Sequence, residues 1–148
     1  MRPFLDSGFL LTLLLKTNGS GKAWEIARQL EGPLLLTSFQ VLSTENRFLR
    51  EMEADDSTPA HRAQAANGLQ NFRWYVEQQV FQSVLLDYGI AIDLAYQWQR
   101  HSKRTVPTLL LLWPAMAVTI GATHFLSFDP RTRLLAQTAG LKLLPEKI

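Results

Sequence analysis

The sequence predicts a single α/β domain in which helices cover both faces of a parallel sheet. Short apolar runs alternate with amphipathic stretches along all 148 residues, and neither internal repeats nor low-complexity tracts interrupt them. Apolar residues make up 47% of the chain and charged residues 19%, which is enough for a sizeable core. Since strands that alternate with helices pair in parallel, we treat residues 1–148 as one such domain.

The first part of the chain predicts two strands and four helices. The apolar runs "RPFLD" and "LLLT" read as strands over residues 2–6 and 34–37. "KAWEIARQL" repeats apolar residues at nearly every 3.6 positions, and Ser38 is a capping residue type before the next helix. A linker is expected over 54–60, and the four helices are expected over residues 7–16, 22–30, 38–53 and 60–82.

The second part predicts three helices and two strands. Pro130 at a first helical position and Gly140 after the last turn delimit one of these helices. Pro114 is expected to start or kink the regular part of another. The expected helices cover residues 88–102, 109–122 and 130–140, and the expected strands cover 124–128 and 141–145.

Composition excludes several classes of function. The chain has no cysteine, which removes disulfides, thiolate zinc sites and cysteine nucleophiles. The apolar run 108–122 is too short to span a membrane, and Asp6 interrupts the apolar N-terminus, so we expect a cytoplasmic protein with no membrane association. The net charge of +2 is no nucleic-acid signature, and the basic run "RHSKR" at 100–104 fits either a solvated loop or a phosphate-contacting patch.

Three acidic residues stand out by their positions. Asp6 and Asp129 both follow expected strands, and in open parallel sheets ligands bind beyond the carboxyl ends of the strands. Asp6 is then exposed at a strand tip, and Glu45 lies mid-helix beside apolar positions. If the three carboxylates converge, a divalent cation is the natural compensation for their repulsion. Alternatively, Asp6 and Asp129 cap the helices that follow them, and Glu45 is a surface residue.

The order of three blocks resembles the PIN-domain family. These blocks are "FLDSGFLL", "LLLTSFQVLSTENRFLR" and "AMAVTIGATHFLSFDPRTRLLAQTAGLKLLP", and together they span most of the chain. PIN domains are small α/β nucleases, many of them toxins of bacterial toxin–antitoxin pairs. The resemblance implies a three-layer α/β/α fold with a central parallel sheet of four or five short strands.

The resemblance also implies an activity and a set of residues. The family cuts RNA with acidic residues around Mg²⁺ or Mn²⁺, so this chain is expected to be a toxin-type endoribonuclease with RNA, an antitoxin and a second copy of itself as partners. The catalytic and metal-binding residues implied are Asp6, Glu45 and Asp129. The expected supporting residues are Ser7, Asn46 and Ser127, and the candidate RNA contacts are Arg47, Arg50 and Arg131.

The chain departs from the family pattern at one acidic position. Counting back from Gly121, the usual further Asp falls on Leu110, and Trp113 stands where many members have His. No acid lies between Asp93 and Asp129 to replace it. This leaves a second hypothesis, a catalytically impaired PIN-like protein that acts by binding RNA or protein. A third, an unrelated α/β binding domain, requires the three acids to be dispersed.

Overall fold

A computed structural model describes residues 1–17, 19–30 and 33–147 and shows a five-stranded, all-parallel sheet in the order β3-β2-β1-β4-β5. This confirms the expected fold class, an α/β domain with a central parallel sheet. Each strand contributes three residues. The strands are β1 (Pro3–Leu5), β2 (Leu34–Leu36), β3 (Phe81–Ser83), β4 (His124–Leu126) and β5 (Lys142–Leu144).

Helices flank the sheet and follow the predicted order. Five helices are capped at their N-terminus by a side-chain oxygen that accepts a backbone N–H. The capping residues are Asp6, Thr37, Thr58, Asp87 and Asp129. The helices are α1 (Ser7–Leu15), α2 (Ser20–Gln29), α3 (Ser38–Glu53), α4 (Pro59–Glu77), α5 (Tyr88–His101), α6 (Thr108–Thr119) and α7 (Pro130–Thr138). Within the described part of the chain, no helix is both long and apolar enough to cross a membrane.

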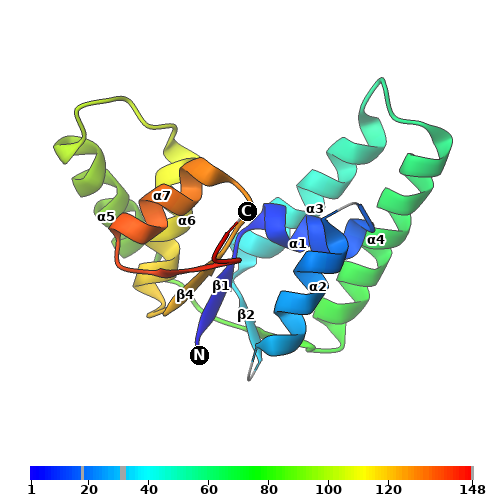
Figure 1. Cartoon of the computed structure of the whole chain (residues 1–148), viewed down its shortest axis with the longest axis horizontal. Helices are drawn as coiled ribbons and strands as arrows, with labels where there is room; N and C mark the ends of the chain where they lie inside the picture. The colour runs from blue at the N-terminus through cyan, green and yellow to red at the C-terminus, as the bar shows by residue number, and fades with distance from the viewer. Residues whose placement is uncertain (18, 31–32, 148) are drawn as a thin grey trace.

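The strands bury alternate side chains in two cores. Leu5, Leu36 and Leu126 face the core formed with α1, α2, α3 and α4. The neighbouring residues Phe4, Leu35 and Phe125 face the opposite core, formed with α5, α6 and α7. Figure 1 shows these two groups of helices on either side of the strands, with the α3–α4 and α5–α6 pairs diverging from one another.

The predicted helix over residues 60–82 is wrong at its C-terminal end. Helix α4 stops at Glu77, and Gln79 adopts a left-handed backbone conformation with φ of 54°. The Val80 N–H then donates to the Tyr75 carbonyl, which closes the helix. The chain turns into β3, which pairs in parallel with β2. Helical periodicity alone extended this helix, because the sequence carries neither Gly nor Pro at the turn.

Candidate functional site

The strand order creates a crevice beside β1. From β1 the chain builds outward through β2 to β3, then crosses back to place β4 on the other side of β1. At such a reversal the connections leave in opposite directions, and ligands bind in the gap beyond the strand ends. Asp6 follows β1 and Asp129 follows β4. Both line a cavity of about 330 Å³, here called the central pocket, with Ser7, Gly8, Thr12, Arg47, Leu109, Leu110, Trp113, Phe128, Arg131 and Thr132.

Asp6 lies at the floor of the central pocket. Its backbone N–H donates to the Leu126 carbonyl on β4, and its Oδ1 accepts the Phe9 N–H at 2.7 Å as the N-cap of α1. The side chain is only 5% exposed, so the expectation of an exposed strand-tip carboxylate is wrong. Burial raises the pKa of Asp6, and so does nearby Asp129. Hydrogen bonds from the Ser127 hydroxyl and the Phe9 amide, together with the charge of Arg47, partly offset the rise.

Asp129 occupies the wall of the pocket and is better compensated. It caps α7, with Oδ1 accepting the N–H of Arg131 at 2.8 Å and the N–H of Thr132 at 3.4 Å. The Arg131 guanidinium donates to Asp129 Oδ2 from Nη2 at 3.0 Å. This side-chain bond is the main reason that the pKa of Asp129 is lowered, with the two backbone donors adding to it against partial burial.

A second arginine faces Asp6. A Cβ added to Gly8 would lie 3.3 Å from Asp6 Oδ1 and 3.7 Å from Arg47 Nη1, so the two side chains lie on the same side of this glycine without forming an ion pair. Arg47 comes from α3, which is tied to β1 by Gln40. The Gln40 side-chain amide donates to the Leu5 carbonyl at 2.6 Å. Asp129 is therefore paired with an arginine, whereas Asp6 has only the nearby charge of Arg47.

The remaining wall of the central pocket is apolar and comes from α6. Leu110, at the position where the family resemblance implies an acid, is half-buried there, and Trp113 is buried. The Trp113 ring packs edge-on against Phe39 and Phe4, with centroids 5.3 and 6.2 Å apart. These contacts hold the indole in place, so this side of the pocket offers no oxygen ligand.

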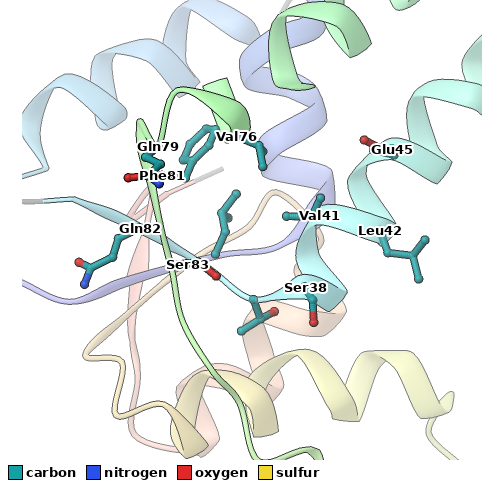
Figure 2. Close-up of a pocket in the computed structure, with 11 residues that line it drawn as sticks. Ser38, Val41, Leu42, Glu45, Val76, Gln79, Phe81, Gln82 and Ser83 are labelled. Carbon is teal, nitrogen blue, oxygen red and sulfur yellow. The ribbon is translucent and has the colours of Figure 1, made fainter. Parts of the chain in front are cut away.

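Glu45 lies elsewhere. It lines a larger cavity of about 720 Å³, here called the edge pocket, between α3, the end of α4 and strands β2 and β3 (Figure 2). Arg73 of α4 binds its carboxylate with two hydrogen bonds of 3.0 and 3.1 Å. The structure thus brings Asp6 and Asp129 into one pocket and places Glu45 in another. The side chains lining the edge pocket are Leu36, Thr37, Ser38, Val41, Leu42, Val76, Gln79, Phe81, Gln82 and Ser83.

The phase of α3 explains this separation. Each residue turns the helix by about 100°, so residues four apart share a face and residues two apart do not. Ser43 and Arg47 share the face toward α6, and Glu45, midway between them, points away. A groove of about 230 Å³, here called the α3–α6 groove, is lined by Ser7, Phe39, Leu42, Ser43, Asn46, Arg47, Arg50, Leu109 and Trp113. Ser43 was missed by sequence reasoning, although the i, i+4 spacing to Arg47 would have found it.

The supporting residues from the sequence lie near the central pocket. Ser7 is buried and lines both the pocket and the α3–α6 groove, and Asn46 and Arg50 line the groove only. Ser127 is fully buried; its hydroxyl accepts the Asp129 N–H at 3.0 Å and bonds Asp6. Ser127 therefore links the Asp6 carboxylate to the backbone of Asp129.

The residues of the central pocket, as arranged, do not fit a divalent cation. Among the residues that the structure describes, no three His, Cys, Asp or Glu side chains gather closely enough to hold a metal ion. Two carboxylates can hold one Mg²⁺ if water and substrate complete the shell. Here, however, Arg131 already binds Asp129, and the charge of Arg47 acts on Asp6.

Of the comparisons with known proteins, the one with solved structures shows a similar fold. No family model matches the chain, and no curated protein matches it. Among solved structures, the crystal structure of Mycobacterium tuberculosis VapC20, a toxin described as cleaving the sarcin–ricin loop, aligns over 94% of this chain and 95% of its own. The TM-score is 0.61 and the sequence identity 16%. This likeness confirms the PIN-like fold expected of a PIN-domain toxin type.

Proposed function

We propose that this chain is a PIN-fold protein that binds RNA without metal-dependent cleavage. One observation carries the proposal: at the strand reversal Asp129 is paired with Arg131 and Asp6 is buried with the charge of Arg47 nearby, whereas Glu45 pairs with Arg73 in a different pocket. This is the second hypothesis from the sequence, and the apolar wall formed by Leu110 and Trp113 supports it.

RNA is the ligand that the charges around the pocket favour. Arg47 and Arg50 are exposed on α3 along the α3–α6 groove, and Arg131 is exposed at the start of α7. Arginine binds phosphate oxygens with a planar fork of donors. Asp129 uses Nε and Nη2 of Arg131, which leaves donors on Nη1 for a phosphate and fixes the plane of the guanidinium. The buried acids would act as positioning groups for these arginines.

The first hypothesis, a Mg²⁺- or Mn²⁺-dependent endoribonuclease using Asp6, Glu45 and Asp129, is the second candidate. One observation favours it: Asp6 and Asp129 share a pocket at the strand reversal of a fold that resembles VapC20. The ribonuclease candidate requires the Glu45 carboxylate to break its ion pair with Arg73 and to point to a different face of α3. An antitoxin peptide, a second copy of the chain and a cytoplasmic location, all implied by the resemblance, belong to either candidate. Exposed Leu109 at the pocket mouth is available to a protein partner.

Binding and cleavage of one RNA probe separate the two candidates. A fluorescein-labelled 24-nucleotide RNA with a stem-loop would be followed by anisotropy in EDTA and in Mg²⁺, and by gel in Mg²⁺ and Mn²⁺. We expect equal affinity with and without metal, no cleavage, and no Mn²⁺-dependent shift in melting temperature. Arg47→Gln should weaken binding about 5-fold or more, since one phosphate contact at moderate salt is worth about that much. Arg28→Gln on α2 is the matched control.

Two results would overturn this proposal. Cleavage by the wild type that is lost in Asp6→Asn and in EDTA would establish the ribonuclease. Failure of the wild type to bind RNA at low salt would remove RNA as the ligand.

A further inference from the structure

The connection between α5 and α6 carries a dense positive charge. Arg100, His101, Lys103 and Arg104 are all exposed, and the chain has no acid between Asp93 and Asp129. In the part of the chain that the structure describes, the ion pairs involve other residues. We call these four residues the basic tip. Unlike the arginines of the central pocket, the side chains of the basic tip have no carboxylate to neutralise them.

The backbone of the basic tip is fixed by its own hydrogen bonds. Ser102 Oγ donates to the Arg104 carbonyl at 2.8 Å and accepts the Arg104 N–H at 3.2 Å. The Gln99 side chain spans the turn, with its amide donating to the Arg104 carbonyl and its oxygen accepting the Val106 N–H at 3.2 Å. Because the backbone of this loop is already ordered, ligand binding does not have to order it, and the entropic cost of binding is lower.

The basic tip lies close in sequence to the α6 wall of the α3–α6 groove. Helix α6 begins at Thr108, only four residues beyond Arg104, and its second residue, Leu109, lines both the groove and the central pocket. Arg47 and Arg50 lie on the other wall, on α3. Figure 1 shows the connection leading from the end of α5 into the start of α6. The basic residues of the groove therefore come from α3, and those of the basic tip precede the helix that forms the opposite wall.

We propose that the basic tip is a second phosphate-binding surface, which holds the continuation of an RNA strand whose first part lies in the α3–α6 groove. The inference rests on the RNA binding proposed above. It also gives the RNA a direction across the molecule, from Arg131 and Arg47 in the central pocket to Arg104 at the tip. A single strand suits this surface, because its backbone can bend from the groove over the start of α6.

The salt dependence of RNA binding tests this inference. Each phosphate contact changes the slope of log K against log salt by about 0.7 for a single strand. The triple variant Arg100→Gln, Lys103→Gln, Arg104→Gln should therefore lower the slope by about 2 and weaken binding by roughly 100-fold at 0.1 M salt. The variant keeps the Ser102 and Gln99 hydrogen bonds, which use only the backbone of residue 104. Its melting temperature checks that it folds.

A charge-matched variant separates local contacts from net charge. Lys16→Gln, Arg28→Gln, Lys142→Gln removes the same three charges elsewhere, and we expect its slope to stay within about 0.5 of the wild type. Equal slopes for the two triple variants would overturn the inference and leave the proposed RNA binding standing, since Arg47→Gln would still weaken it. The alternative ligand of the basic tip is the acidic turn around Asp55 and Asp56 in a second copy of the chain. A basic-tip variant that changes the oligomeric mass in light scattering but keeps the RNA slope would also overturn the inference.

Discussion

The central pocket lies beyond the ends of β1 and β4 and the edge pocket lies along β2 and β3, and the two pockets differ in chemistry. The edge pocket is about twice as large and mostly apolar, and its one carboxylate, Glu45, is held by Arg73 in a half-exposed pair. The central pocket is small and polar, and it contains the buried Asp6. Position in the sheet accounts for the difference, because only the central pocket lies where the strand order reverses.

This comparison shows that an acid near a strand end is not by itself a site. Asp6 is costly to bury, and the Ser127 hydroxyl, the Phe9 amide and Arg47 offset only part of that cost, so its pKa stays raised. Glu45 stays near solvent and needs no such set. A polar network that is buried and satisfied specifies one arrangement, whereas an exposed ion pair contributes little.

The largest difference in stability should lie between Arg133→Met, near the central pocket, and Arg73→Met, at the edge pocket, which is described below. Arg133 is buried behind the central pocket and donates to the carbonyls of Ser127, Pro145 and Glu146 at 3.0, 2.6 and 3.3 Å. Arg133→Met should lower the free energy of unfolding by about 2–4 kcal/mol, because it leaves buried acceptors without donors. Urea denaturation followed by circular dichroism measures this loss. A loss below about 1 kcal/mol would mean that water replaces the guanidinium.

Supplying the absent acid should convert the central pocket into a metal site. Leu110→Asp places a third carboxylate beside Asp6 and Asp129, and Mn²⁺ should then raise the free energy of unfolding by about 1.4 kcal/mol at ten times its dissociation constant. The wild type should show no such rise. Leu42→Asp, beside Glu45 at the edge pocket, is the control and should not respond. A wild-type response as large as that of Leu110→Asp would favour the ribonuclease.

The two carboxylates of the central pocket should respond to pH in opposite directions. Because the pKa of Asp6 is raised on folding, the native state binds the extra proton, and stability falls as pH rises from about 4 through the folded pKa. The pKa of Asp129 is lowered, so its contribution is present above about 4 and is lost as pH falls through the folded pKa. Asp6→Asn should therefore raise the melting temperature at pH 7, and Asp129→Asn should lower it. The same sign for both would contradict this assignment.

The smallest effect is expected at the edge pocket. Arg73→Met removes an ion pair whose arginine is about half exposed. We expect a denaturation midpoint within error of the wild type and unchanged RNA affinity, since Glu45 takes no part in the proposed site. A weaker RNA affinity in Arg73→Met would connect the edge pocket to function.

Much of the fold could be predicted from the sequence, and part of the site. The alternation of strands and helices was predicted, and the capping of α1 by Asp6 and of α7 by Asp129 was the alternative left open beside a metal site. The rule that ligands bind beyond strand ends correctly indicated that these two acids lie close together. Strand β3 was missed because the turn at Gln79 is set by the pairing of β3 with β2 rather than by a turn-forming residue.

The placement of Glu45 could be predicted only in part. Its neighbours Leu42 and Phe48 suggested an inward face, yet Phe48 is fully buried and Leu42 is 66% exposed. Helix phase relative to the sheet decides which face meets α6, and nothing within α3 itself fixes that phase. The contact that does so, from Gln40 to the Leu5 carbonyl, joins residues far apart in sequence.

By itself the sequence determined the local order of this protein, because periodicity, caps and chain breaks act over a few neighbouring residues. It determined that Asp6 and Asp129 follow strands and begin helices. Only the tertiary structure decided that β1 and β4 lie side by side, that Asp6 is buried beside β4, and that the charge of Arg47 acts on it. Burial and Coulomb interaction depend on distance in space, and here they join segments that are about 40 to 120 residues apart in the chain.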